Sequence, residues 1–415
     1  MCGIAGVVAL NGGAPASLDA VRPMARTIRH RGPDRLNAWL SPTGRCALGH
    51  ARLRVIDLES GDQPIANEDG SIQVVFNGEI YNHRSLRTEL EHSGHRFRTE
   101  SDTEVLAHGY EQWGVDVVER LEGMFAFAIW DERAARLMVA RDRAGKKPLF
   151  VSRRGDTFVF GSEMKALLAH PGFETAVDAE AIPLYLAYGY VPGSRTVYKD
   201  VRKLPPATVA TLDEDGCWTE KRYWEPTFRP EAIHADAAVA EVRGLLENAV
   251  SSRLESDVPL GAFLSGGLDS TAVVGLMSRM SDRPVRTFSI GFEGQPLFDE
   301  TRFAREASEA FGTSHTEFLV GPQSIDLVDR LVGHYDEPFG DSSAIPTYVV
   351  SKLAREHVTV ALTGDGGDEL FAGYLRFQGA RLAEALPGWG ARVGGIAARA
   401  IPHHSDFRSP QRRAK

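Results

Sequence analysis

The N-terminal half of the chain alternates short apolar runs with a few segments of helical period. Apolar residues recur at helical spacing in 18–28 and 86–90, which predicts two helices. The apolar runs that we predict to be buried strands are 4–10, 74–76, 125–129, 137–140 and 158–160. Several strands with few helices between them predict two sheets sandwiched by helices, an α+β fold of αββα architecture.

In the C-terminal half, strands alternate with helices, which indicates an α/β fold with a doubly wound parallel sheet. We predict strands at 258–264, 286–292, 316–320 and 357–362, and helices at 235–253, 271–280, 301–311 and 325–332. The first of these helices is expected to be amphipathic, with an apolar face formed by Val239, Val242, Leu246 and Val250. Prolines and an acidic turn mark the passage between the halves, so we expect a boundary near 226–234 and domains at 2–226 and 235–415.

Composition narrows the classes of protein that fit. The 415 residues are 43% hydrophobic and 25% charged, as in globular proteins, and the length suits two or three domains. A net charge of −9 is mild and argues against a nucleic-acid or anionic-membrane partner. No apolar run approaches the ~18 residues that span a membrane. Three cysteines are too few and too scattered for a disulfide framework or a zinc site, so we expect a reducing, cytoplasmic setting.

The candidate chemistry begins at a glycine loop between the strand at 258–264 and the helix at 271–280. The loop residues are Leu264, Ser265, Gly266, Gly267, Leu268, Asp269 and Ser270. A glycine loop that joins a strand to a helix N-terminus presents free N–H groups to an anion, and the helix dipole adds to the attraction. A Walker loop would carry Lys before its Ser or Thr, and this loop has no Lys. The pattern predicts a phosphate site, with an ordinary glycine-rich turn as the alternative.

The loop sequence Ser-Gly-Gly-Leu-Asp-Ser resembles the PP-loop of ATP pyrophosphatases, which split ATP between its α and β phosphates. The resemblance implies an ATP site in which this loop cradles the leaving pyrophosphate. A second loop, 363–369, follows the strand at 357–362, and three strand ends are expected to meet at one edge of the sheet. Its carboxylates on a glycine backbone suit Mg²⁺ that bridges phosphate oxygens, with a solvated acidic turn as the alternative.

At the other end of the chain, removal of Met1 would give Cys2 a free α-amine. Such a residue contains both a nucleophile and its own base, because an amine of pKa ~8 can take the thiol proton. A small apolar residue that happens to come second is the alternative.

Polar clusters lie where the predicted strands of this half end. The clusters and the N-terminus read Cys2-Gly3-Ile4, His30-Arg31-Gly32-Pro33-Asp34, His50-Ala51-Arg52-Leu53, Phe76-Asn77-Gly78-Glu79-Ile80-Tyr81-Asn82 and Ser101-Asp102-Thr103-Glu104. They resemble class II glutamine amidotransferase domains, which are N-terminal-nucleophile (Ntn) hydrolases that release ammonia from glutamine. The resemblance implies an Ntn-hydrolase sandwich for 2–226.

The resemblance also implies a role for each polar residue. Cys2 would be the nucleophile. Arg52 would form a forked ion pair with the α-carboxylate of glutamine, a geometry that suits a guanidinium. Asp102, together with Glu79, would hold the α-ammonium group.

Two neighbouring residues would complete the glutamine site. The amide of Asn77 and the backbone N–H of Gly78 would stabilise the oxyanion of the tetrahedral intermediate. The alternatives are purely structural roles: a surface charge for Arg52, a hairpin turn for Asn77-Gly78 and a helix cap for Asp102. Agreement of several segments in type and order favours the glutamine site.

The C-terminal half resembles the synthetase domain of the asparagine synthetases. By that likeness, the residues expected to touch adenosine are Leu264, Ile290, Thr363 and Gly364. Asp269 and Asp368 would hold Mg²⁺. Many members carry Glu at the position of Asp365, a group that aids formation of the acyl-adenylate or its attack by ammonia, and Asp is one methylene shorter.

The resemblance covers essentially the whole chain and implies a glutamine-hydrolysing asparagine synthetase. Its substrates would be aspartate, glutamine and ATP, and its products asparagine, glutamate, AMP and pyrophosphate, formed through β-aspartyl-AMP. Two alternatives stay open: the same chemistry on another carboxylate, such as a cell-envelope or natural-product precursor, and a glutaminase-only or regulatory protein. A homodimer is an open expectation. Because the family's synthetase domain runs well beyond residue 415, we expect this domain to be incomplete at its C-terminal end.

Overall fold

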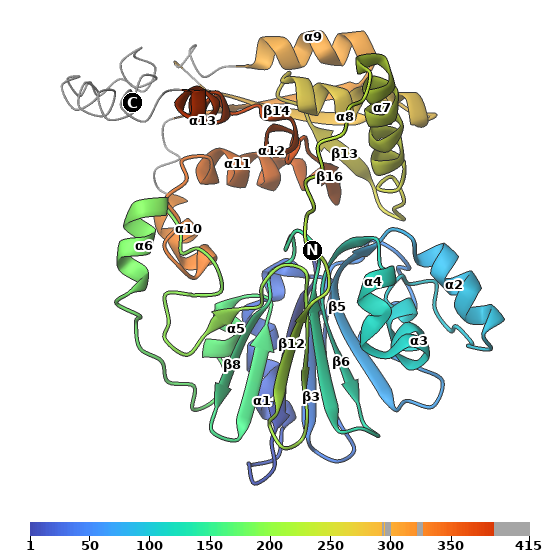
Figure 1. Ribbon diagram of the computed structural model, residues 1–415, viewed down its shortest axis with the longest axis vertical. Coiled ribbons are helices and arrows are strands. Elements are labelled where there is room, and N and C mark those ends of the chain that lie inside the picture. Colours follow the sequence, from blue (N-terminus) through green and yellow to red (C-terminus); the bar gives the residue numbers. More distant parts are fainter. Residues whose placement is uncertain (293, 295–299, 322–326, 386–415) are drawn as a thin grey trace.

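The computed structural model describes residues 1–292, 294, 300–321 and 327–385 (Figure 1). Residues 386–415 of the second predicted domain, and 325–326 of a predicted helix, lie outside the described residues. Two six-stranded sheets form the N-terminal half, and a four-stranded sheet lies in the C-terminal half.

The two sheets of the N-terminal half stack face to face, and their neighbouring strands are antiparallel. One sheet has the order β10-β8-β9-β1-β3-β2, and the other has the order β12-β11-β7-β6-β5-β4. The first sheet contains β1 (Gly3–Ala9), β2 (Arg35–Leu40), β3 (Cys46–Arg52), β8 (Phe150–Arg154), β9 (Thr157–Gly161) and β10 (Arg202–Lys203). The second contains β4 (Ile65–Ala66), β5 (Ile72–Ile80), β6 (Gly123–Asp131), β7 (Arg136–Arg141), β11 (Thr208–Leu212) and β12 (Trp218–Arg222).

Helices cover the outer face of each sheet, so three apolar cores separate four layers. The helices are α1 (Leu18–Thr27) and α5 (Met164–Leu168) on the first sheet, and α2 (His83–His92), α3 (Glu104–Trp113) and α4 (Val117–Arg120) on the second. In β5, Val74 and Phe76 face the helices, whereas Val75 faces the other sheet. Burial of both faces explains the continuous apolar runs, and the predicted αββα architecture is confirmed.

The sheet of the C-terminal half has the order β15-β14-β13-β16, with all neighbours parallel. Its strands are β13 (Leu260–Phe263), β14 (Arg286–Phe292), β15 (Ser314–Val320) and β16 (Val360–Leu362). The helices are α7 (Ala235–Ser251), α8 (Leu268–Met280), α9 (Thr301–Phe311), α10 (Val328–Tyr335), α11 (Ala344–Ala354), α12 (Gly367–Phe371) and α13 (Leu375–Ala385). Separate cores form with Val274 and Ala304 on one face and with Val350 on the other. The doubly wound parallel sheet is therefore confirmed.

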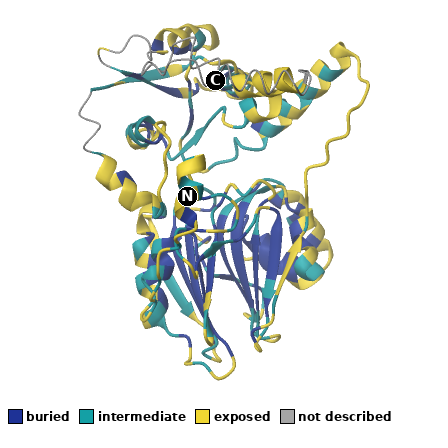
Figure 2. Ribbon diagram, turned by 60° about the vertical axis from the view of Figure 1, so that its left-hand side comes forward, coloured by how far each residue is buried: buried dark blue, intermediate teal, exposed yellow. Residues whose placement is uncertain are grey.

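Two predicted elements of this half differ from the structure. On the predicted apolar face of α7, Val250 is buried, but Val239 is 58% exposed, and the face borders a groove of about 660 Å³ between α7 and α8. The strand predicted at 357–362 is reduced to β16. The backbone N–H groups of His357 and Val358 donate to Ala354, so these residues extend the last turn of α11 instead. Figure 2 shows that buried residues concentrate in the N-terminal half.

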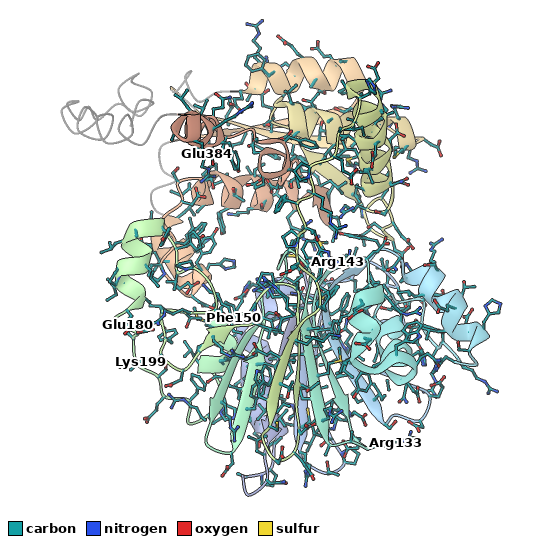
Figure 3. The ribbon with its side chains drawn as sticks, viewed as in Figure 1. Arg133, Arg143, Phe150, Glu180, Lys199 and Glu384 are labelled. Atoms are coloured by element: carbon teal, nitrogen blue, oxygen red, sulfur yellow. The ribbon has the colours of Figure 1, made fainter. Side chains whose placement is uncertain are left out.

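The two halves meet through polar contacts, and residues 223–234 between them form no helix or strand. The backbone N–H of Asp57 donates to the Asp257 carboxylate at 2.8 Å. Lys165 Nζ lies 2.8 Å from Asp336 Oδ1. Figure 3 draws the side chains along this junction.

Among the described residues, no helix combines the length and the apolar character needed to cross a membrane. All three cysteines lie in the described part of the chain and are free thiols, with Cys2 half-buried, Cys46 buried and Cys217 exposed.

Candidate active sites

Cys2 lies directly before β1, beside the end of β3. Its Sγ accepts a hydrogen bond from the Leu53 N–H at 3.4 Å, and the thiol lies 3.6 Å from the Leu53 carbonyl oxygen. Burial raises the pKa of the Cys2 thiol. Burial also lowers the pKa of the α-amine at Met1 to about 5. This amine belongs to the chain with Met1 in place, whereas the expected base is the α-amine that removal of Met1 would leave on Cys2.

The segment that follows α1 is held against Cys2. Arg31 Nε donates to the Cys2 carbonyl oxygen at 2.9 Å, and Arg31 Nη1 donates to Glu163 Oε1 at 2.8 Å. His30 Nε2 lies 2.9 Å from the same Glu163 oxygen. Burial alone would raise the pKa of Glu163, but hydrogen bonds from His30, Lys165 and Arg31 hold it well below its usual range. Glu163 is therefore an anion that anchors the 30–34 segment.

Arg52 ends β3, and its side chain is buried, so the surface-charge alternative is wrong. Its Nη1 donates to Asp62 Oδ1 at 2.5 Å, and its Nη2 donates to the Asp57 carbonyl oxygen. The guanidinium thus already pairs with a carboxylate. A substrate carboxylate that binds there would exchange with Asp62, which is partly exposed.

Asn77 is fully buried in β5, where it pairs with Ala126 of β6. Neither its Nδ2 nor its Oδ1 has a hydrogen-bond partner in the protein. Because a buried amide without partners is costly, such a group is a candidate for contact with a ligand. Asn77 and Gly78 both lie inside a strand of nine residues, so the hairpin-turn alternative is wrong.

The backbone N–H of Gly78 points away from β6. Its partner across the ladder is Phe125, whose N–H and C=O both bond to Asp142 on the other side of β6. Residues two apart on a strand point their N–H groups to the same edge. The N–H of Phe76 donates to Gln63, and that of Ile80 donates to Asp102. The Gly78 N–H lies between these two on the same edge, next to the Asn77 side chain.

Two carboxylates lie at the end of β5, with Asp102 buried and Glu79 half-buried. Asp102 Oδ2 accepts the Ile80 N–H at 2.8 Å, and α3 begins at Glu104 with Thr103 as its N-cap residue, so the helix-cap alternative is wrong. Burial raises the pKa of Asp102 to about 6. Burial, and then repulsion from Asp102, raise the pKa of Glu79 well above its usual range. A cation bound between these groups would stabilise both as anions.

In the C-terminal half, the glycine loop joins β13 to the N-terminus of α8 and is exposed at Ser265 and Gly267. The hydroxyls of Ser265 and Ser270 lie 3.0 Å apart and bond to the loop backbone. Gly266 has a φ of +78°, and a Cβ there would lie 2.4 Å from the backbone of Phe303. The loop conformation therefore requires glycine at 266.

The second predicted loop lies directly beside the first. A Cβ on Gly364 would lie 2.6 Å from the backbone nitrogen of Ser270, and one on Gly367 would lie 2.3 Å from Asp269 Cγ. Asp365 is exposed and accepts a hydrogen bond from Thr363 Oγ1 at 3.0 Å. Leu264 is buried, and its N–H donates to Phe288 of β14, the strand that contains Ile290.

The two loops follow β13 and β16, where the order of strands reverses, which is the usual ligand crevice of such a sheet. The predicted ATP residues therefore lie toward the carboxyl ends of the strands of one sheet. For the predicted magnesium ligands, the structure packs the Asp269 carboxylate against Gly367 and the Asp368 carboxylate against Gly373.

Two family models match the chain, a glutamine amidotransferase domain over residues 1–224 and asparagine synthase over residues 241–413. The chain is 38% identical to asparagine synthetase (glutamine-hydrolyzing) 1 of Bacillus subtilis strain 168, over 90% of this chain and 59% of that protein. It is also 38% identical to a Methanocaldococcus jannaschii protein provisionally named asparagine synthetase (glutamine-hydrolyzing) 2, over 90% of this chain and 76% of that protein. The chain belongs to the glutamine-hydrolysing asparagine synthetase family.

This member of the family spans about six-tenths of the length of its Bacillus subtilis relative. Among solved structures, it is similar to glutamine phosphoribosylpyrophosphate amidotransferase from B. subtilis complexed with ADP and GMP, with 19% identity and a TM-score of 0.40 over 76% of this chain and 65% of that chain. The αββα assignment rests on the strand order and the three cores, since a TM-score this low adds nothing to it.

The sequence did not predict that Lys147 interacts electrostatically with Glu79 of the candidate glutamine site. Lys147 is buried after β7, and its N–H donates to Asp142 at 3.0 Å. Burial lowers the pKa of its ammonium group to about 8, against the attraction of Glu79. The motif Arg-Ala-Gly-Lys-Lys was the available signal, but nothing in it indicates that the second lysine faces a carboxylate 68 positions earlier.

Proposed function

We propose that this chain hydrolyses glutamine and uses the ammonia in an ATP-dependent amidation of aspartate to asparagine. The proposal rests on Asn77, whose side chain is fully buried and whose amide has no hydrogen-bond partner in the protein. Next to it, the backbone N–H of Gly78 points away from β6. Two free donors next to each other support an oxyanion hole here, the feature that an acyl-transfer site needs.

In the proposed glutaminase step, the Cys2 thiolate attacks the side-chain carbonyl carbon of glutamine after the free α-amine has taken the thiol proton. The oxyanion is stabilised by Asn77 and Gly78, and its collapse expels ammonia with the transferred proton. Water then cleaves the thioester to give glutamate. Arg52 holds the substrate α-carboxylate in exchange for Asp62.

The raised pKa values of Asp102 and Glu79 support their proposed role toward the glutamine α-ammonium. Asp102 is buried and Glu79 is half-buried, and the two carboxylates repel each other, so a bound ammonium would supply the countercharge that they lack. Lys147 supplies part of that charge in the protein alone.

In the proposed synthetase step, the aspartate β-carboxylate attacks the α-phosphorus of ATP and pyrophosphate leaves. Ser265, Gly266 and Gly267, with the N-terminus of α8, hold the leaving group, as expected of a glycine loop at a helix start. The adenosine would lie against Leu264, Ile290, Thr363 and Gly364. Ammonia then attacks β-aspartyl-AMP and releases AMP.

The carboxylate donors around the two loops fit Mg²⁺, which prefers oxygen ligands and would neutralise phosphate charge there. Asp269 is held against Gly367, within the same loop pair as the helix N-terminus. Asp269 and Asp368 are its proposed ligands. Asp365 is the proposed group beside the acyl-adenylate.

The test measures pyrophosphate release from ATP with ammonia supplied, with and without aspartate, beside glutamate release from glutamine. The proposal expects aspartate-dependent pyrophosphate together with glutamate. Pyrophosphate with another carboxylic acid but not with aspartate would overturn the acceptor assignment. Glutamate without any pyrophosphate would reduce the function of this chain to that of a glutaminase.

A further inference from the structure

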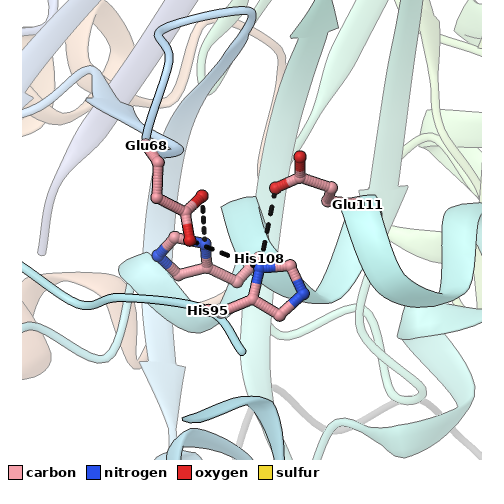
Figure 4. A group of neighbouring side chains, drawn as sticks. All are labelled: Glu68, His95, His108 and Glu111. Atoms are coloured by element: carbon pink, nitrogen blue, oxygen red, sulfur yellow. Dashed lines mark ion pairs between the residues drawn. The ribbon is translucent and has the colours of Figure 1, made fainter. Parts of the chain in front are cut away.

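Four side chains with metal-binding atoms converge on the outer side of the second sheet, apart from the residues assigned to glutamine and ATP. Glu68 follows β4, His95 follows α2, and His108 and Glu111 lie about one turn apart on α3 (Figure 4). One ligand atom from each lies within 4.8 Å of the others. We propose that these four residues bind one divalent metal ion, with Zn²⁺ as the best-suited ion.

The separations of the ligand atoms fit a tetrahedral zinc site. His108 Nδ1 lies 3.3 Å from Glu68 Oε2, and His95 Nδ1 lies 3.5 Å from Glu68 Oε1 and 3.7 Å from Glu111 Oε2. Bonds of ~2.0–2.1 Å from a tetrahedral zinc ion to nitrogen and oxygen put neighbouring ligand atoms ~3.3–3.4 Å apart. The separations among one ligand atom from each residue reach up to 4.8 Å, so side-chain shifts of about 1 to 1.5 Å would bring the four atoms around one ion.

Neighbouring residues orient both imidazoles for metal binding. His108 Nε2 lies 3.4 Å from Glu104 Oε1, and His95 Nε2 lies 3.3 Å from Gln112 Oε1. A histidine that donates its Nε2–H to such an acceptor presents a lone pair at Nδ1, which is the arrangement found around metal-bound histidines. Both Nδ1 atoms then face Glu68.

The buried Nδ1 of His108 is the atom that most needs a ligand. The His108 side chain is fully buried, and its Nδ1 makes no hydrogen bond although Glu68 lies 3.3 Å away. The other ring nitrogen is directed at Glu104, so a carboxylate oxygen lies next to each nitrogen of this buried ring. A divalent cation would satisfy both imidazoles and balance the two carboxylates of Glu68 and Glu111.

The donor set selects the class of ion. Two imidazole nitrogens and two carboxylate oxygens suit zinc, whereas Mg²⁺ and Ca²⁺ prefer oxygen ligands alone. The carboxylates are also held from outside the cluster. Glu68 Oε1 accepts the Arg96 N–H at 2.8 Å, and Glu111 Oε1 lies 3.4 Å from Asn67 Nδ2.

The proposed ion would link the segment that contains Glu68 and the segment that contains His95 to α3. That helix begins two residues after Asp102, so the site would fix the element next to the candidate ammonium-binding carboxylate. Its role would be structural, and its test does not depend on amidotransferase activity.

The experiment adds Zn²⁺ to the whole chain after removal of metals with EDTA. Calorimetry follows binding, and anomalous scattering at the zinc edge in crystals locates the ion. We expect one zinc ion among the four residues. His95→Ala should weaken its binding at least 100-fold, and Gln112→Ala should weaken it about tenfold or more. Zinc should also raise the melting temperature of the wild type, but not that of His95→Ala.

His92→Ala is the matched control, because His92 is an exposed histidine at the end of α2. It should leave zinc affinity at this site unchanged. Replacement of His95 instead of the buried His108 limits damage to the fold, and circular dichroism checks each variant. A zinc peak elsewhere, such as at Cys2, with none among the four residues would overturn the proposal. Equal zinc affinity of His95→Ala and the wild type would overturn it as well.

Discussion

At the scale of single residues, the candidate glutamine site is built from polar groups that are buried without enough partners. Asn77 has no partner for its amide, and Asp102 is a carboxyl whose pKa burial raises to about 6. Such groups cost stability in the protein alone, so their presence together is best explained by a substrate that completes them.

Asn77→Ala removes a proposed oxyanion donor without removing any side-chain hydrogen bond within the protein. We expect kcat for glutamine hydrolysis to fall about 10²–10³-fold, as for other single oxyanion donors. The KM for glutamine should change little, because the contact strengthens in the transition state. Steady-state kinetics of glutamate release measure both. A loss confined to KM would contradict the assignment.

Glutamine binding should weaken in acid because Asp102 loses its charge. A carboxyl with a pKa near 6 is neutral below that pH and cannot pair with the glutamine α-ammonium. The Kd for glutamine, measured by calorimetry on Cys2→Ala protein to avoid turnover, should rise about tenfold per pH unit below pH ~6. Asp102→Asn should bind glutamine at least ~10-fold more weakly at pH 7.5. A Kd that stays constant from pH 7.5 to 5 would contradict this role.

At the scale of elements, the predictable strands were those buried on both faces, such as β5, β6 and β7, because their apolar runs are continuous. The strand β3 was missed, since His50 and Arg52 break its apolar pattern although both are buried. His50 stays neutral there, with a pKa that burial lowers to about 3. The candidate site residues Cys2, Arg52, Asn77 and Asp102 were predicted from local motifs, and their roles stay predictions. The contacts of Glu163 with His30 and Arg31 were not predicted, because these partners lie more than 130 positions away in the sequence.

The glycine loop gives a prediction at this scale. Gly266→Ala forces a Cβ into the left-handed region and against the Phe303 backbone. We expect the loop to shift and ammonia-dependent pyrophosphate release to fall at least tenfold, while glutamate release stays within twofold of the wild type. Gly244→Ala is the control, because nothing lies within 4 Å of its new Cβ. Equal pyrophosphate release by the two variants would remove the loop from the ATP site.

At the scale of the whole molecule, the two candidate sites lie in different halves joined by a polar network. Lys165 contacts Glu163 in the N-terminal half and Asp336 in the C-terminal half, and Glu163 contacts Arg31. A continuous set of contacts thus runs from the backbone of Cys2 to the C-terminal half.

Lys165→Met breaks this network while it keeps most of the side-chain volume. We expect glutamine hydrolysis to continue but to be coupled less tightly to synthesis, so that more glutamate forms per pyrophosphate, by about twofold or more. Lys199→Met, which changes an exposed lysine of the same half, is the control. The two products are measured in one reaction with glutamine, ATP and aspartate. An unchanged ratio would show that the network does not couple the sites.

The most direct test of two separate sites is Cys2→Ala, assayed for pyrophosphate release with glutamine and, in parallel, with ammonia. The account predicts that the variant loses glutamate formation and glutamine-dependent pyrophosphate release, and that it retains the wild-type rate with ammonia. Loss of both activities in a folded variant, or continued use of glutamine, would contradict it.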